Sequence, residues 1–384
     1  MLKDLSLPAV SAGLLAGFVG FASSFAVIIR GLTAVGATQE QAASGLMAVS
    51  IAMGLCGVLL SLTRRLPISV AWSTPGAALL ATSGAVPGGF SAAVGAFLLT
   101  GALIVAAGMS KPLGRWVASI PPSLASAMLA GVLLNLCLAP ARAVAQSPGM
   151  GLAIVLAWAI TARFNRLLAV PAAVLVAGIL VAASVAMPPG LAASLIPHPI
   201  LMVPSFSIQA VIGIAIPLFI VTMASQNIPG MAVLSVNGYA PHPGPLFRWT
   251  GLFTMLSAPF GGHAVNLAAI TAALCAGPDA HPDPAKRYWA ACVAGIVYVV
   301  FGLFAGAATA FIGVAPPVLI EAVAGLALLG AFGGALMGAV SAPEHREAAI
   351  VTFLVSGSGL TFFGIGGAFW GLLAGGALYL ARRR

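Results

Sequence analysis

Apolar runs of about twenty residues, joined by short polar or Pro/Gly-rich connections, recur along the whole 384-residue chain. A helical run of that length crosses the hydrocarbon core of a bilayer. The runs lack the alternating pattern of membrane barrels. The pattern therefore predicts an all-α polytopic membrane protein with 14 spans. The spans start near Leu7, Gln41, Pro67, Phe90, Ser119, Met150, Val170, Ile208, Leu246, Gly262, Tyr288, Pro317, Glu347 and Gly364.

Charge supports this class, because charged residues make up only 6% of the chain, whereas a soluble domain carries about a quarter. With a cytoplasmic N-terminus, 14 of the 16 Lys and Arg residues fall on the cytoplasmic side, and Arg30 and Arg142 fall on the other. This asymmetry follows the positive-inside rule and predicts an inner-membrane protein with both termini cytoplasmic. It also argues against a nucleic-acid partner, despite the net charge of +9. The cytoplasmic set is Lys3, Arg64, Arg65, Lys111, Arg115, Arg163, Arg166, Arg248, Lys286, Arg287, Arg346, Arg382, Arg383 and Arg384.

The sequence offers no recognisable machinery for catalysis or for a bound cofactor. The four cysteines, Cys56, Cys137, Cys275 and Cys292, lack CxxC spacing and are interpreted as buried thiols. We find no Walker loop for ATP and no HExxH zinc motif. We therefore predict a protein without metal or cofactor that is not an enzyme, and a membrane enzyme is the least favoured alternative.

Three segments of the first half resemble three segments of the second half in the same order, at offsets of roughly 200 residues. They are AGFVGFASSFAVIIRGL with LFIVTMASQNIPGMAVL, VAWSTPGAALLATSG with HAVNLAAITAALCAG, and PPSLASAMLAGVLL with PPVLIEAVAGLALL. Seven spans per half is an odd number, so the second half enters the membrane from the opposite side. The sequence thus predicts two inverted repeats, an architecture typical of secondary transporters.

The third and tenth spans are predicted to be discontinuous, each a short strand followed by a half-helix. The third opens with the β-favouring PISVAW and then meets Pro75-Gly76, and the tenth opens at Gly261-Gly262-His263. Extended backbone at membrane depth is tolerated where it is buried in protein or lines a cavity. Breaks at corresponding positions of the two halves indicate a binding site near the membrane centre.

At these residues the sequence resembles the benzoate membrane transporter family, through SSFAVIIRGL (23–32), AWSTPGAALL (71–80) and GGHAVNLAAITAAL (261–274). It is similar, more distantly, to nucleobase permeases and sulfate-type anion transporters. The resemblance implies proton-coupled symport of benzoate or a similar aromatic carboxylate by alternating access. It implies a core domain from 1–110 and 206–313 and a gate domain from 111–205 and 314–384. Protons, the lipid bilayer and a possible homodimer complete the expected partners.

The resemblance also transfers positions. In nucleobase permeases, acidic residues on spans 8 and 10 bind substrate, and here those positions align with Gln226 and His263. Their absence favours an anionic substrate over a nucleobase. Another small anion or a nucleobase remains the alternative cargo. A passive anion channel is the alternative of another class, although ion filters use rings of charge or carbonyls, and the scarcity of such charge argues against it.

An aromatic carboxylate needs donors or positive potential at one end and apolar walls around its ring. Half-helix N-termini, expected at Thr74 to Gly76 and at Asn266 to Leu267, would supply the positive potential. The full set of predicted substrate contacts is Ser23, Ser24, Trp72, Ser73, Thr74, Gln226, Asn227, His263 and Asn266. For each, a purely structural role stays open: hydroxyls bond the helix backbone, Trp72 packs, and the amides satisfy a break at Pro229.

Proton coupling has two candidates. His263 lies at the predicted site, and an imidazole titrates near neutrality. Glu321 lies inside an apolar run, where a carboxylate must be protonated or paired. We predict that His263 carries the proton and that Glu321 has a structural or gating role. The alternatives are a neutral His263 bonded to the backbone and a Glu321 that reaches the membrane interface.

Overall fold

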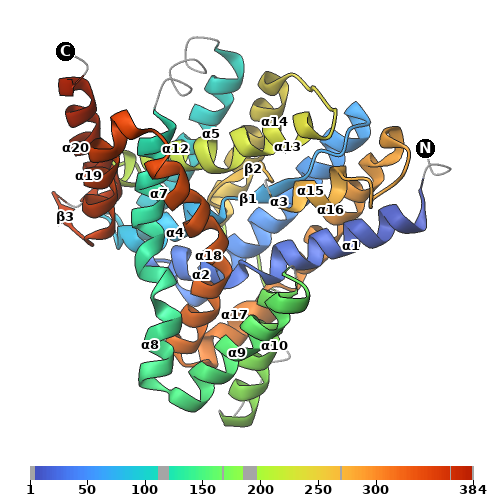
Figure 1. Cartoon of the computed structure of the whole chain (residues 1–384), viewed down its shortest axis with the longest axis horizontal. Helices are drawn as coiled ribbons and strands as arrows, with labels where there is room; N and C mark the ends of the chain where they lie inside the picture. Colours follow the sequence, from blue (N-terminus) through green and yellow to red (C-terminus); the bar gives the residue numbers. More distant parts are fainter. Residues whose placement is uncertain are drawn as a thin grey trace.

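The computed structural model describes residues 5–110, 121–166, 168–184, 197–268, 270–363 and 365–382, which are mostly helical (Figure 1). Several predicted features lie outside these residues, namely the span starts Ser119 and Gly364 and the cations Lys3, Lys111, Arg115, Arg383 and Arg384. Within the described part, seven helical stretches are long and apolar enough to cross a membrane: Leu7–Ala34, Gln39–Arg64, Gly89–Met109, Pro122–Gln146, Ile208–Ser235, Pro284–Leu303 and Pro317–Val340. Shorter apolar helices are Pro148–Phe164, Ala169–Ser184 and Gly367–Ala381. The chain is thus a helical membrane protein, and the number of crossings stays a prediction.

The first long stretch is broken at Ser23-Ser24 into α1 (Leu7–Ala22) and α2 (Phe25–Ala34). The next helix, α3 (Gln39–Arg64), begins at a capping box. The Thr38 hydroxyl accepts from the Gln41 N–H at 3.2 Å, and the Gln41 amide oxygen accepts from the Thr38 N–H at 2.9 Å. These two bonds satisfy backbone donors that would otherwise have no partner at the start of the helix.

Two short strands lie side by side near the middle of the molecule (Figure 1). Strand β1 (Val70–Trp72) pairs antiparallel with β2 (Val265–Leu267), with Ala71 opposite Asn266 at the centre. Helix α4 (Thr74–Ser83) follows β1, and α15 (Ile270–Ala276) follows β2. The two segments therefore have the predicted order of strand and then helix. The ladder gives their extended backbone the hydrogen-bond partners that buried backbone in a membrane protein needs.

The start of the second half-helix was predicted incorrectly. Asn266 and Leu267 were expected at a helix N-terminus, but both belong to β2. Pairing with β1 keeps them extended, and α15 begins at Ile270. Measured by the strands, Leu267 corresponds to Trp72, whereas the sequence alignment of the repeats placed Val265 there. The correspondence between the two repeats that follows from the strand pairing therefore differs by two residues from the one given by the sequence alignment.

The stretch that contains Gln226 is continuous rather than broken at Pro229-Gly230. It passes through α11 (Ile208–Ala210), a π-helix η3 (Val211–Ala215), α12 (Ile216–Thr222), a second π-helix η4 (Met223–Asn227) and α13 (Ile228–Val236). The Ile228 N–H donates to the Met223 carbonyl, the i→i+5 bond of a π-turn. Pro229 has no backbone N–H to donate, and the wider π-turn lets the helix continue past it. Such π-turns occur frequently at functional sites.

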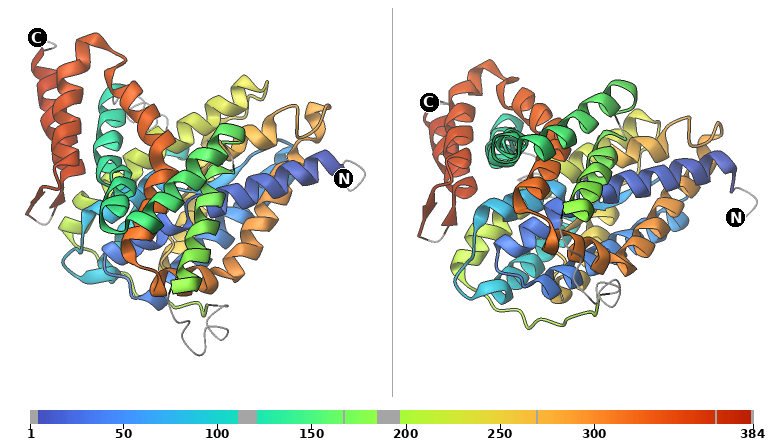
Figure 2. Two further views of the ribbon diagram at one scale, coloured as in Figure 1. Left: turned by 60° about the horizontal axis from the view of Figure 1, so that its bottom comes forward. Right: turned by 90° about the horizontal axis from the view of Figure 1, so that it is seen from below.

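The remaining elements complete two groups of helices that pack mainly among themselves. In one group, α3 packs on α16, α14 on α5 and α1 on α16, while in the other, α7 packs on α18 and α19 and α9 on α10 (Figures 1 and 2). The elements not yet given are α5 (Gly89–Met109), α7 (Pro122–Cys137), α8 (Ala139–Gln146), α9 (Pro148–Phe164), α10 (Ala169–Ser184), α14 (Pro243–Ser257), η5 (Ala258–Phe260), η6 (Pro284–Lys286), α16 (Tyr288–Leu303), α17 (Ala305–Val314), α18 (Pro317–Val340), η7 (Pro343–His345), α19 (Arg346–Gly357), β3 (Thr361–Phe362), β4 (Ile365–Gly366) and α20 (Gly367–Arg382).

Glycine permits a close contact between α3 and α16. A Cβ added at Gly295 would lie 2.6 Å from the Gly54 carbonyl oxygen, so the two backbones touch without side chains between them. Small residues at such crossings are typical of membrane helices, because no hydrophobic driving force holds helices together in lipid. This packing fixes α16 beside the strand pair, where one of its side chains reaches the site described next.

Candidate functional site

A cavity of about 70 Å³ lies beside the strand pair, where α1, α3, β1, α4, η4, α15 and α16 meet. Five of the nine predicted contacts line it: Ser23, Ser24, Trp72, Thr74 and Gln226. The other lining residues are Val19, Gly20, Met53, Ala71, Ala268, Thr271 and Tyr298. The break of the first span, the start of α4 and the π-turn η4 thus converge on one space.

Ser24, at the α1–α2 break, holds Trp72 in place at one wall of the cavity. The Ser24 hydroxyl accepts from the Trp72 indole N–H at 2.8 Å and donates to the Gly20 carbonyl at 3.1 Å. Trp72 is buried, and its ring lies 5.3 Å from that of Phe21. With its N–H satisfied, the indole offers an apolar face to the cavity. Trp72 therefore has a packing contact and also borders the site.

The start of α4 is capped by Ser73, which is fully buried and does not line the cavity. Its hydroxyl accepts from the Gly76 N–H at 3.1 Å and from the Thr222 hydroxyl at 3.0 Å. Thr74, the first residue of the helix, lines the cavity. The positive end of the α4 dipole therefore lies at the cavity wall, where it favours an anion.

His263 is fully buried behind this turn and is not a lining residue. Its Nε2 lies 3.0 Å from the Ser73 carbonyl oxygen. A carbonyl oxygen can only accept, so Nε2 carries a hydrogen and donates. Within the described part of the chain, Nδ1 has no hydrogen-bond partner. The imidazole thus contacts the turn that begins α4 and has no direct access to the cavity.

Asn227 and Asn266 hold the second strand and do not line the cavity. The Asn227 amide oxygen accepts from the Leu267 N–H at 2.9 Å, and its NH₂ group lies 3.2 Å from the Met223 sulfur. The Asn266 NH₂ group donates to the Leu267 carbonyl at 2.8 Å. Both side chains therefore bond backbone groups at the end of β2, and Asn227 does not serve the break at Pro229 that the sequence suggested for it.

Two hydroxyl-bearing lining residues were missed by the sequence reasoning, Thr271 of α15 and Tyr298 of α16. The Tyr298 hydroxyl donates to the Ala16 carbonyl at 3.3 Å. Each is an isolated polar residue in an apolar span, and this was the signal available in the sequence. The facing of these spans, which depends on packing, could not be obtained from the repeats alone.

Residues 3–381 match the family described as Benzoate membrane transport protein. The chain belongs to this family. It is 42% identical over 376 residues to the inner membrane protein YdcO of Escherichia coli (strain K12), covering 97% of this chain and 95% of that protein. It is 32% identical over 379 residues to the benzoate membrane transport protein of Acinetobacter baylyi, covering 98% and 95% of the two chains. The resemblance carried by 23–32, 71–80 and 261–274 is thereby confirmed.

Solved anion transporters share the fold of this benzoate transport family member. The transmembrane domain of the cyanobacterial bicarbonate transporter BicA matches with a TM-score of 0.56 at 14% identity, covering 98% of both chains. SLC26A9 matches with a TM-score of 0.64 at 13% identity, covering 100% of this chain and 66% of that one. At such identities the likeness concerns the fold alone.

Glu321 of this benzoate transport family member forms an ion pair with Arg30. Its carboxylate lies 2.8 Å from the Arg30 guanidinium, and the two side chains keep 27% and 47% of their surface exposed. The pair joins α2 to α18 beside a cavity of about 140 Å³ that shares no lining residue with the first one. Glu321 thus takes one of its two predicted states and lies apart from the candidate substrate site.

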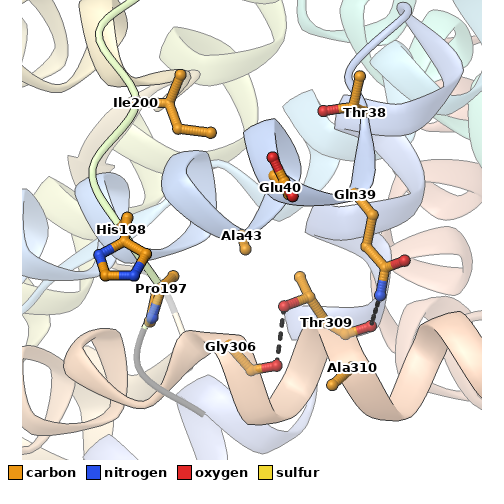
Figure 3. Close-up of a pocket in the computed structure, with 10 residues that line it drawn as sticks. All are labelled: Thr38, Gln39, Glu40, Ala43, Pro197, His198, Ile200, Gly306, Thr309 and Ala310. Carbon is orange, nitrogen blue, oxygen red and sulfur yellow. Dashed lines mark hydrogen bonds between the residues drawn. The ribbon is translucent and has the colours of Figure 1, made fainter. Parts of the chain in front are cut away.

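A larger hollow of about 710 Å³ lies between the start of α3 and α17 (Figure 3). It contains none of the predicted site residues. Figure 3 shows Gln39 reaching across it, where its amide N–H donates to the Thr309 carbonyl at 3.2 Å. Its ionisable side chains, Glu40 and His198, are exposed. Exposed groups in a wide hollow give a small anion no desolvated contact, so the smaller cavity is the better candidate.

Proposed function

We propose that this chain is a secondary active transporter that moves benzoate or a similar aromatic carboxylate together with protons across the inner membrane. The observation that carries this proposal is the cavity in which the apolar face of Trp72 lies near the N-terminus of α4. The carboxylate would lie at Thr74, where the helix dipole favours negative charge. Gln226 would add a side-chain donor, and the ring would lie against Trp72.

Binding is proposed to require opening of the cavity walls. Its volume of about 70 Å³ is about half of the roughly 150 Å³ apolar cavity that accepts benzene in another protein. A monocyclic acid therefore does not fit until a wall moves. Gln226 is suited to move, because its side chain makes no hydrogen bond within the described part of the chain. Movement of one helix group against the other would open the site further.

The architecture proposed for this motion has 14 crossings in two inverted repeats. The core comprises 1–110 and 206–313, the gate comprises 111–205 and 314–384, and both termini are cytoplasmic. The antiparallel pair of β1 and β2 supports it, because such a pair has an approximate two-fold axis at Ala71 and Asn266. The inner-membrane relative supports the choice of membrane, and the solved anion transporters share the fold.

His263 is proposed to carry the coupled proton, through the turn that begins α4. Its Nε2 is bonded to the Ser73 carbonyl, and Ser73 caps the helix whose first residue borders the cavity. A positive charge at His263 would raise the potential at that helix start and strengthen binding of a carboxylate. By linkage, a bound carboxylate would favour protonation of His263 by the same factor.

The decisive experiment is accumulation of radiolabelled benzoate in proteoliposomes with an imposed inward proton gradient. A coupled carrier concentrates benzoate above the external level, whereas a passive channel brings the two levels to equality. Thr74→Val should weaken benzoate binding, while Thr352→Val, a matched change in α19 at a hydroxyl bonded to the Ala348 carbonyl, should not. A thermal-shift panel of aromatic acids, nucleobases and inorganic anions identifies the cargo, and exclusive stabilisation by a nucleobase would overturn the assignment.

A further inference from the structure

The cavity beside the Arg30–Glu321 pair has room for an aromatic ring. Its volume is about 140 Å³, close to the roughly 150 Å³ apolar cavity that accepts benzene in another protein. Ile29 and Ile320, which are both buried, and Pro317 form its apolar walls. It has about twice the volume of the candidate substrate cavity. A ring therefore fits here without the wall movement that the smaller cavity requires.

Arg30 gives this apolar cavity a positively charged wall. Within the described residues, Glu321 is the one polar partner of its guanidinium. A guanidinium presents several N–H donors in a planar fork that matches a carboxylate, so part of the fork stays available. Thr33 does not compete for a ligand, because its hydroxyl donates to the Ile29 and Arg30 carbonyls. The cavity thus combines carboxylate donors with walls that suit a ring.

Glu321 occupies the position on Arg30 that an incoming carboxylate would take. Both side chains of the pair are partly exposed, and an ion pair of this kind contributes little stability, so Glu321 can turn toward water at small cost. A benzoate that replaces it brings the same negative charge to Arg30. It also removes its ring from water against the apolar walls, which favours the exchange. Because the charges are exposed, this site binds more weakly than a buried one.

Helix α2 connects this cavity to the candidate substrate cavity. Ser24, the residue before the first turn of α2, lines the substrate cavity, and Arg30 lines the second one. Six residues of helix rise by roughly 9 Å. In the proposed topology, Arg30 is one of the two cations on the outer side of the membrane. The second cavity therefore lies farther along the same helix in the outward direction.

We propose that the cavity beside Arg30 is an outer loading site, in which an aromatic carboxylate displaces Glu321 from Arg30 before it reaches the substrate cavity. The proposal rests on the proposed function for the class of ligand and for the side that faces outward. Because Arg30 binds the ligand and Glu321 competes with it, replacing the two residues should have opposite effects on binding. A pair that only ties α2 to α18 would be broken equally by either replacement.

The test measures how benzoate protects Thr33→Cys, at an exposed position of this cavity, from an impermeant maleimide in the cysteine-free full chain in right-side-out vesicles. Benzoate should slow the labelling in a saturable manner. Glu321→Gln should lower the half-protecting concentration about two- to fivefold, and Arg30→Gln should raise it by a similar factor. The control Arg142→Gln, which removes the other outer cation, should leave it unchanged. Acetate, a carboxylate without a ring, should not protect at the same concentrations.

Shifts in the same direction for Arg30→Gln and Glu321→Gln would overturn the inference, as would equal protection by acetate. Loss of protection in Thr74→Val would overturn it too, because the protection would then come from ligand in the substrate cavity. Absence of protection in a chain that accumulates benzoate would remove the loading site and leave the proposed function standing, whereas a chain that neither binds nor accumulates benzoate would remove both. If Thr33→Cys does not fold, opposite shifts of the half-saturating external benzoate concentration in the Arg30 and Glu321 variants decide the question.

Discussion

The ion pair between Arg30 and Glu321 should bias the transporter toward one access state. It connects α2 of the proposed core with α18 of the proposed gate at 2.8 Å. In the repeat alignment, Arg30 corresponds to Ala232 and Glu321 to Ser126, which cannot form an ion pair. The ion pair therefore has no counterpart between the corresponding residues of the other repeat. Removing it should favour the state in which α2 and α18 separate.

The expected magnitude follows from the exposure of the pair. Its side chains keep 47% and 27% of their surface exposed, so the scale for exposed pairs applies, about 0.2–1 kcal/mol. Since about 1.4 kcal/mol corresponds to a tenfold change in an equilibrium constant, Glu321→Gln should shift the ratio of the two states by at most about fivefold. The reversed pair, Arg30→Glu with Glu321→Arg, should recover part of the shift.

Cysteine accessibility measures this shift. Thr33 lines the cavity beside the pair, so Thr33→Cys in a cysteine-free background should react up to about fivefold faster with an impermeant maleimide when Glu321 is replaced by Gln. The matched control is Asp283→Asn, which removes the 3.7 Å surface pair with Lys286. An unchanged labelling rate in Glu321→Gln, or an equal increase in the control, would refute the proposed bias.

Further predictions concern coupling, the cavity and topology. The glutamine in His263→Gln can still donate to the Ser73 carbonyl but cannot bind the proton, so proton-driven accumulation should be lost and downhill exchange retained. Glu321→Gln should keep proton-driven accumulation. The opposite pattern in proteoliposomes would exchange the roles of the two residues. Gly20→Ala should abolish binding of aromatic acids in thermal-shift assays, because its methyl group collides with the Tyr298 hydroxyl, while Gly376→Ala, which meets open space, should bind normally. Cysteines placed at either terminus should be labelled from the cytoplasmic side alone, and labelling from outside in intact cells would contradict the proposed topology.

The sequence predicted the class of the molecule and its central break well, because both depend on local composition. Long apolar runs indicate membrane helices, and β-favouring residues before Pro75-Gly76 indicate a strand before a half-helix. The start of α15 at Ile270 could not be predicted in the same way. It depends on pairing with β1, a contact between residues nearly 200 positions apart in the chain.

The candidate site was predicted in its location but not in the role of each side chain. Thr74 and Gln226 line the cavity, whereas Ser73, Asn227 and Asn266 bond backbone groups of the turns and strand that surround it. Short polar side chains near a backbone break can serve either purpose. Which purpose wins depends on how the segment is rotated about its axis, and sequence pattern does not determine that rotation.

The pairing of β1 with β2 also has a consequence for biosynthesis. Val265 follows Trp72 by 193 residues, so β1 leaves the ribosome long before its partner is made. Until then its backbone donors and acceptors lack the ladder, and the membrane interior offers no water in its place. The first half of the chain should therefore stay incompletely inserted or chaperone-bound until the second half arrives. A ribosome-stalled fragment that ends before Val265 should be far more sensitive to protease than the finished protein.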